Sequence, residues 1–130
     1  MILYHGTTSI ALPSIAQLGL IPGKFHGADA YAKMVDPFGY FPPRDPSVFL
    51  AKVERVAEWY ASMAIKVRHG KPLCLKVSVP SAITNKLITD EAEPDGNAVR
   101  YQGIVKPSWI ISYKVGSGDW QTFKSLEHAA

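Results

Sequence analysis

The spacing of apolar and polar residues predicts two helices and a set of short strands. Apolar residues recur at helical spacing between Lys52 and Val67, with one face made by Val53, Val56, Ala57, Tyr60, Ala61 and Ala64. A shorter helix is predicted from Pro13, a favoured first residue, to Gly19, a favoured stop. Short apolar or alternating runs predict strands at 2–4, 47–51, 73–79, 86–88, 99–104, 109–115 and 120–123.

The order of these elements indicates an α+β fold. Both helices lie in the first half of the chain and strands dominate the second half, unlike the regular alternation of a parallel α/β sheet. Residues 23–47 are rich in glycine, proline and aromatic residues. A loop of this length in a small domain is usually functional or disordered, and its aromatic residues indicate that it packs on something, for example a ligand.

Length and composition restrict the class of protein. With 130 residues, the chain is expected to be a single domain, 1–130. Hydrophobic residues make up 47% and charged residues 19%, a globular balance. No apolar run is long enough to span a membrane, and no signal-peptide pattern is visible. The single cysteine, Cys74, excludes a disulfide framework, so we expect a cytoplasmic protein that does not act at a membrane.

Charge and histidine spacing narrow the candidate chemistry. The net charge of +3 is compatible with an anionic ligand such as a dinucleotide or a nucleic acid. The four histidines fit no zinc pattern, so no metal is expected. Neither G-x-G-x-x-G nor a P-loop pattern is present, so the usual nucleotide-binding fingerprints are absent. His5 follows an apolar strand and precedes Gly6, which predicts an imidazole at a strand end, where ligands are often held.

Several short segments, in this order, resemble the ADP-ribosyltransferase fold. The opening Tyr4-His5-Gly6-Thr7-Thr8, with Ile15 and Gly19-Leu20, is similar to that of the family, and Val48-Phe49-Leu50-Ala51 before a helix with Ala57 and Tyr60 resembles its second motif. The segments Arg68–Val77 and Gly103–Ile110 are similar to RNA 2′-phosphotransferases, whose catalytic lobe gives the nearest pattern. The resemblance implies a compact split β-sheet with a few short helices and with NAD in a cleft between two small sheets.

The resemblance also implies a role for each matching residue. His5 would bond the adenosine ribose and the backbone of Gly6 would meet the nicotinamide carboxamide. Thr7 or Thr8 would add a hydroxyl contact. Phe49 and Tyr60 would sandwich the nicotinamide ring. The remaining cofactor-binding positions implied are Ala51, in the second motif, and Arg44, just before it.

The expected reaction is NAD-dependent transfer of ADP-ribose, with RNA, DNA or a phosphate-bearing nucleotide as acceptor. Transferases of this fold commonly grip the ribose with a glutamate on a late strand, but this chain offers Gln102, or Ala98 or Asn97 in another alignment. RNA 2′-phosphotransferases instead hold a 2′-phosphate with arginines, which Arg68 and Arg44 would match. His5, Arg68 and Gln102 are thus the expected catalytic residues. The alternatives are 2′-phosphotransferase-like activity and non-catalytic binding of NAD or ADP-ribose.

Overall fold

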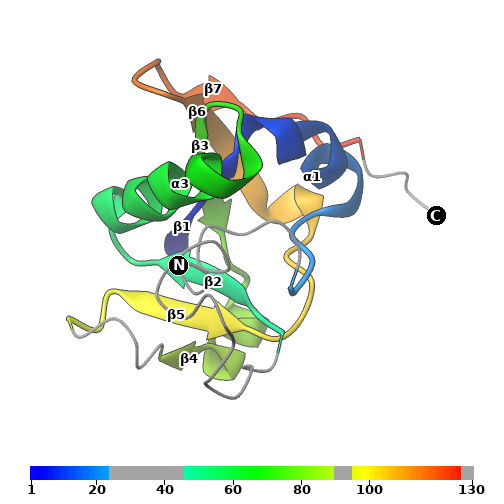
Figure 1. Ribbon diagram of the computed structural model, residues 1–130. Helices are drawn as coiled ribbons and strands as arrows, with labels where there is room; N and C mark the ends of the chain where they lie inside the picture. The colour runs from blue at the N-terminus through cyan, green and yellow to red at the C-terminus, as the bar shows by residue number, and fades with distance from the viewer. Residues whose placement is uncertain (24–45, 90–94, 127–130) are drawn as a thin grey trace.

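A computed structural model of the chain describes residues 1–23, 46–89 and 95–126. Figure 1 shows helix α3 (Glu54–Arg68) lying across an antiparallel sheet, with the shorter helix α1 (Leu12–Leu18) near the C-terminal end of the chain. The described residues therefore confirm an α+β fold. Both predicted helices are confirmed within two residues at each end.

Seven strands form the sheet within the described ranges. They are β1 (Ile2–Thr8), β2 (Val48–Ala51), β3 (Pro72–Ser78), β4 (Ile88–Thr89), β5 (Ala98–Tyr101), β6 (Ile110–Val115) and β7 (Gln121–Thr122). Three 3₁₀ turns, η1 (Ser9–Ala11), η2 (Ser81–Lys86) and η3 (Pro107–Trp109), connect them. The strand order is β4-β5-β2-β1-β3-β6-β7, and every pairing is antiparallel.

Strand β1 pairs very unequally with its two neighbours. Seven consecutive pairs join it to β3, from Ile2↔Ser78 to Thr8↔Pro72. A single pair, Tyr4↔Ala51, joins it to β2. The expectation of two separate small sheets is therefore corrected. The strands form one sheet, because this pair links β4, β5 and β2 to the other four.

The two faces of the sheet bury different side chains. On one face, Leu3, Leu73, Leu75 and Val77 form the main core, together with Ile15 from α1. On the other face, Ala57 of α3 forms a smaller cluster with Ala51 of β2 and Cys74 of β3. Small residues there allow the helix to approach the strands closely.

The described helices include none that is both long and apolar enough to cross a membrane.

Candidate active site at the junction of β1 and β2

The imidazole of His5 lies where β1 and β2 separate. Its Nδ1 is 2.8 Å from the backbone carbonyl oxygen of Phe49, and the residue is 2% exposed. The backbone pairing of the two strands consists of Tyr4↔Ala51 alone, so this side-chain bond follows directly on the last backbone pair. The His5 side chain therefore forms a hydrogen bond between β1 and β2 at the point where their backbone pairing ends.

This contact fixes the chemistry of the ring. A carbonyl oxygen can only accept a hydrogen bond, so Nδ1 of His5 carries the proton and donates it to Phe49. In the neutral ring, Nε2 is then the acceptor nitrogen. A ribose hydroxyl needs an acceptor of this kind for its proton.

The predicted position of His5 at a strand end is wrong. β1 continues to Thr8, because β3 pairs with it along its whole length. His5 is thus the fourth residue of a seven-residue strand. What ends near His5 is the pairing with β2 and not the strand itself.

Gly6 is required by the packing of α3. A Cβ atom at this position would lie 1.8 Å from the carbonyl oxygen of Ala57 and 2.7 Å from the backbone nitrogen of Ala61. The sequence interpretation assigned the missing side chain to the approach of a nicotinamide. The structure gives a different reason, which is that a helix backbone occupies the space.

The alternation of β1 separates the predicted cofactor residues into two groups. Gly6 faces α3, the helix that bears Tyr60, so its neighbours His5 and Thr7 face the opposite side, among the main-core residues. Ala51 lies with the α3-side cluster, and Phe49 shares its side of β2 because it is two residues away. A ligand that touches both groups would have to pass the junction itself.

Arg68 is placed at a helix end and not in a strand. It is the last residue of α3, and His69 and Gly70 then turn the chain toward β3, with φ angles of 65° and 83°. The Oγ1 of Thr8 donates to the carbonyl oxygen of His69 at 2.5 Å, which joins this turn to the far end of β1. Thr8 is three residues from His5, or about 10 Å along a strand, so Arg68 and His5 lie in different parts of the site.

The backbone of His69 is strained. Its φ of 65° and ψ of −168° fall in a region that glycine alone adopts readily. Such a conformation costs a larger residue about 1–3 kcal/mol and persists only when its surroundings hold it.

The remaining predicted residues lie near the end of β5 or outside the described ranges. Gln102 follows β5 directly and is exposed. Arg44 lies outside the described residues. Sequence reasoning missed Arg100, which stands opposite Phe49 in the β2–β5 register and whose Nη1 is 3.4 Å from Oγ of Ser47. Only the strand register identifies Arg100 as a neighbour of the site.

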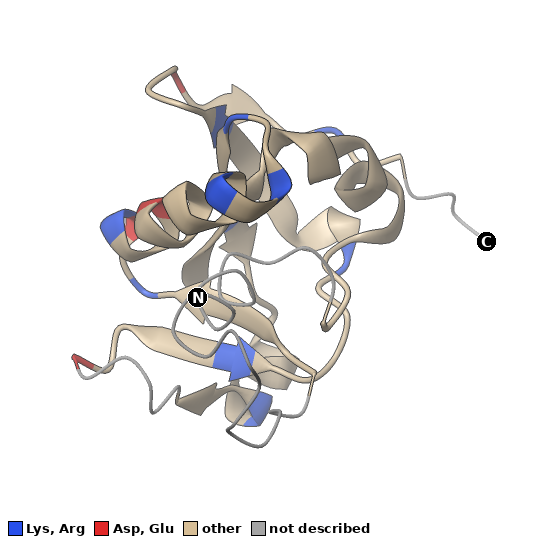
Figure 2. Cartoon of the chain, viewed as in Figure 1, with Lys and Arg blue, Asp and Glu red and all other residues tan. Residues whose placement is uncertain are grey.

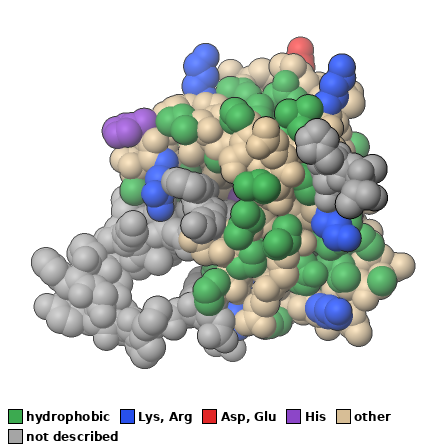
Figure 3. Space-filling model, turned by 90° about the vertical axis from the view of Figure 1, so that its right-hand side faces the viewer, with side chains coloured by type: hydrophobic (Ala, Val, Ile, Leu, Met, Phe, Trp, Pro, Cys, Tyr) green, Lys and Arg blue, Asp and Glu red, His purple; other side chains and the backbone are tan. Residues whose placement is uncertain are grey.

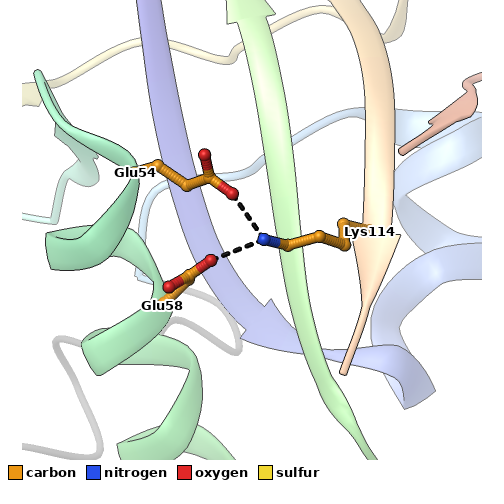
Figure 4. Close-up of polar contacts among 3 residues, drawn as sticks. All are labelled: Glu54, Glu58 and Lys114. Carbon is orange, nitrogen blue, oxygen red and sulfur yellow. Dashed lines mark hydrogen bonds and ion pairs between the residues drawn. The ribbon is translucent and has the colours of Figure 1, made fainter. Parts of the chain in front are cut away.

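A second polar cluster lies on the α3 side of the sheet. Figure 4 shows Lys114 of β6 reaching between Glu54 and Glu58, one turn apart on α3. Its Nζ also lies 5.3 Å from the ring centroid of Trp120. The hydrogen bond from Lys114 lowers the pKa of Glu54, and the bonds to both carboxylates raise the pKa of Lys114.

This cluster borders an open pocket but does not resemble a reactive centre. Glu58, Cys74, Lys114 and Ser117 are among the residues that line the pocket. Burial raises the pKa of the Cys74 thiol to about 12, so the thiol stays protonated and unreactive at neutral pH. We assign the cluster a structural role in holding α3 on the sheet.

Neither the described side chains nor the comparisons with known proteins identify a metal centre or a family. In the described ranges, no group of three or more His, Cys, Asp or Glu side chains is arranged to hold a metal ion. Comparison with protein-family models found no match, and neither did comparison with curated proteins.

Proposed function

We propose that this chain is an NAD-dependent ADP-ribosyltransferase whose acceptor is a nucleic acid or a phosphate-bearing nucleotide. The observation that most supports the proposal is the buried, oriented imidazole of His5 at the junction of β1 and β2. A polar ring in an apolar core is costly unless it is bonded, and this ring is held in one orientation by its bond to the Phe49 carbonyl. It belongs to the segment that resembles the transferase opening.

The groups around the junction fit the parts of NAD. The acceptor nitrogen of His5 suits a ribose hydroxyl. The peptide of Gly6 lies beyond the last backbone pair with β2, so it suits the carboxamide of nicotinamide. Phe49 and Tyr60 supply aromatic rings on the α3 side for the nicotinamide, a contact worth about 0.5–1.5 kcal/mol beyond area burial.

In the proposed reaction, C1′ of the nicotinamide ribose exchanges its bond to nicotinamide for a bond to the acceptor. The bond to nicotinamide breaks and its electron pair leaves with the neutral base. An oxygen or nitrogen of the acceptor bonds to C1′ and releases its proton to solvent. The protein contributes mainly by holding NAD and the acceptor in line, with His5 on the adenosine ribose and with either Gln102 on the reacting ribose or Arg68 on a phosphate of the acceptor.

Non-catalytic binding of NAD or ADP-ribose is the second candidate. It is favoured by Gln102, which stands at the end of β5 without the negative charge that would stabilise a developing cation. The two functions differ in one cheap observable, the release of nicotinamide.

The decisive experiment is incubation with labelled NAD and separate pools of RNA, DNA and protein, with nicotinamide release followed in parallel. We expect label in nucleic acid. His5→Asn is the matched variant, because its amide can still donate to the Phe49 carbonyl while the acceptor nitrogen is lost. It should remain folded and lose turnover. No release and no thermal shift with NAD, ADP-ribose or nicotinamide would overturn the proposal.

Two further variants identify the catalytic group. If the ribose is gripped from β5, Gln102→Ala lowers the rate and Gln102→Glu keeps or raises it. If a phosphate is held instead, Arg68→Ala is the more damaging change, by about 10- to 150-fold, and Arg68→Lys does not rescue it because the two-pronged contact is lost. Normal turnover in both alanine variants would place catalysis elsewhere.

A further inference from the structure

Charge is distributed unevenly over the described residues. The acidic residues in these ranges are Glu54, Glu58, Asp95 and Asp119. The basic residues are Lys52, Arg55, Lys66, Arg68, Lys71, Lys76, Lys86, Arg100, Lys106, Lys114 and Lys124. Figure 2 shows the acidic positions toward the left of the molecule, whereas basic positions continue to the C-terminal end of α3 and beyond it.

Three exposed basic groups gather at the C-terminal end of α3. Lys66 lies in the last turn of the helix, His69 follows it, and Lys71 precedes β3. We refer to these three residues as the α3-end patch. The nearest acidic residue on the same helix, Glu58, is two turns away from Lys66 and is bound to Lys114. In Figure 3, Lys and Arg side chains lie around the rim of a neighbouring face whose centre is hydrophobic.

The backbone that carries the patch is held in place. The amide of Lys71 donates to Oγ of Ser9 at 2.9 Å, and the amide of Ser9 donates to the carbonyl oxygen of Lys71 at 2.8 Å. Thr8 holds the carbonyl of His69 in the same way. A histidine occupies the strained position where glycine would be more stable, so its imidazole is displayed at a cost in folding free energy.

We propose that the α3-end patch docks a single-stranded nucleic acid through its phosphates, with the imidazole of His69 stacking on a base. This inference rests on the proposed function, because it names the surface that would receive the acceptor. Lysines pair with phosphates, and aromatic rings, including imidazole, stack on unpaired bases. A patch that served only the helix dipole would need neither the strained histidine nor its fixed turn.

The test measures anisotropy of fluorescein-labelled oligouridylate and oligothymidylate, without NAD. We expect Lys66→Gln with Lys71→Gln to weaken binding about tenfold or more, and to reduce the slope of log K against log salt by about 1.4, for two lost contacts on a single strand. The matched control is Lys52→Gln with Arg55→Gln, which removes two exposed charges at the opposite end of the same helix. The control should bind like the parent chain.

His69→Gly distinguishes a role of His69 in nucleic-acid binding from a role in stabilising the fold. Glycine relieves the strained backbone, so the melting temperature should rise while oligonucleotide binding falls. Equal losses in the patch and control variants would overturn the proposal, because total charge would then explain binding. The proposal would also be overturned if the parent chain bound neither oligonucleotide. A parallel measurement with phosphatidylserine vesicles would overturn it if the patch bound only the vesicles. Oligonucleotide binding without nicotinamide release would instead contradict the proposed activity and leave the patch intact.

Discussion

The two edges of β1 differ in how they are joined to the rest of the sheet. Toward β3, backbone pairs run from one end of the strand to the other. Toward β2, one backbone pair is followed by the side chain of a histidine. A single strand thus anchors the fold by backbone pairing along one edge, whereas along the other edge a side-chain hydrogen bond takes over from the backbone pairing.

The largest effect is expected where β1 meets α3. Gly6→Ala places a methyl group 1.8 Å from the Ala57 carbonyl oxygen, and neither backbone can move without breaking its own hydrogen bonds. We expect the free energy of unfolding to fall by about 3 kcal/mol or more. Urea unfolding followed by circular dichroism measures the loss. An unaffected midpoint would mean that α3 does not lie this close to β1.

His5→Ala should have the next largest effect. It removes the hydrogen bond from His5 to the part-buried Phe49 carbonyl, which costs about 1–3 kcal/mol. His5→Asn should recover most of that loss, because its amide restores the donor. Urea midpoints of the two variants decide the matter. If both are equally unstable, the ring acts by filling space and the junction has no special bond.

Lys114→Met tests the well-paired part of the sheet, where β6 lies beside β3. Removing the bonds to Glu54 and Glu58 should lower the free energy of unfolding by about 1 kcal/mol, because all three side chains are partly exposed to water. Lys86→Met, which alters an exposed lysine in η2, is the matched control and should be neutral.

Lys114→Met should also change how the stability of the fold depends on pH. Because the folded-state pKa of Glu54 is below its ordinary 4.5, its contribution is complete above pH 4.5 and is lost as the pH falls below that value. The folded-state pKa of Lys114 is above 10.5, so its contribution is complete below pH 10.5 and is lost at higher pH. As the pH is lowered from 6 to 3, the melting temperature of Lys114→Met should therefore fall less steeply than that of the parent chain. Parallel curves would contradict the ion pairs.

The smallest effect on stability is expected at Gln102. The side chain is exposed just beyond β5, so Gln102→Ala should change the free energy of unfolding by less than about 0.5 kcal/mol. Thermal melts in the absence of NAD check this value. A larger loss would give Gln102 a structural role, and any effect on rate would then lose its simple interpretation.

The sequence alone determined the class of fold and most of its elements. The apolar face of α3, the glycine after α1 and the alternation of β3 are local patterns, and each predicted element has a counterpart in the structure within a few residues. Local periodicity suffices there because each element buries one side chain set in a regular repeat. The same reasoning singled out His5 and Gly6 but placed them at the end of the strand, which continues to Thr8.

The tertiary structure decided what those residues do. The bond from His5 to Phe49 spans 44 residues, and the contacts of Lys114 with α3 span 56 and 60. No local pattern encodes such pairs, because they depend on which strands become neighbours and in what register. For the same reason, local pattern could not show that the backbone of α3 occupies the space beside Gly6. Residue types in the sequence indicated the candidate chemistry, but strand order and helix packing determined which of them meet.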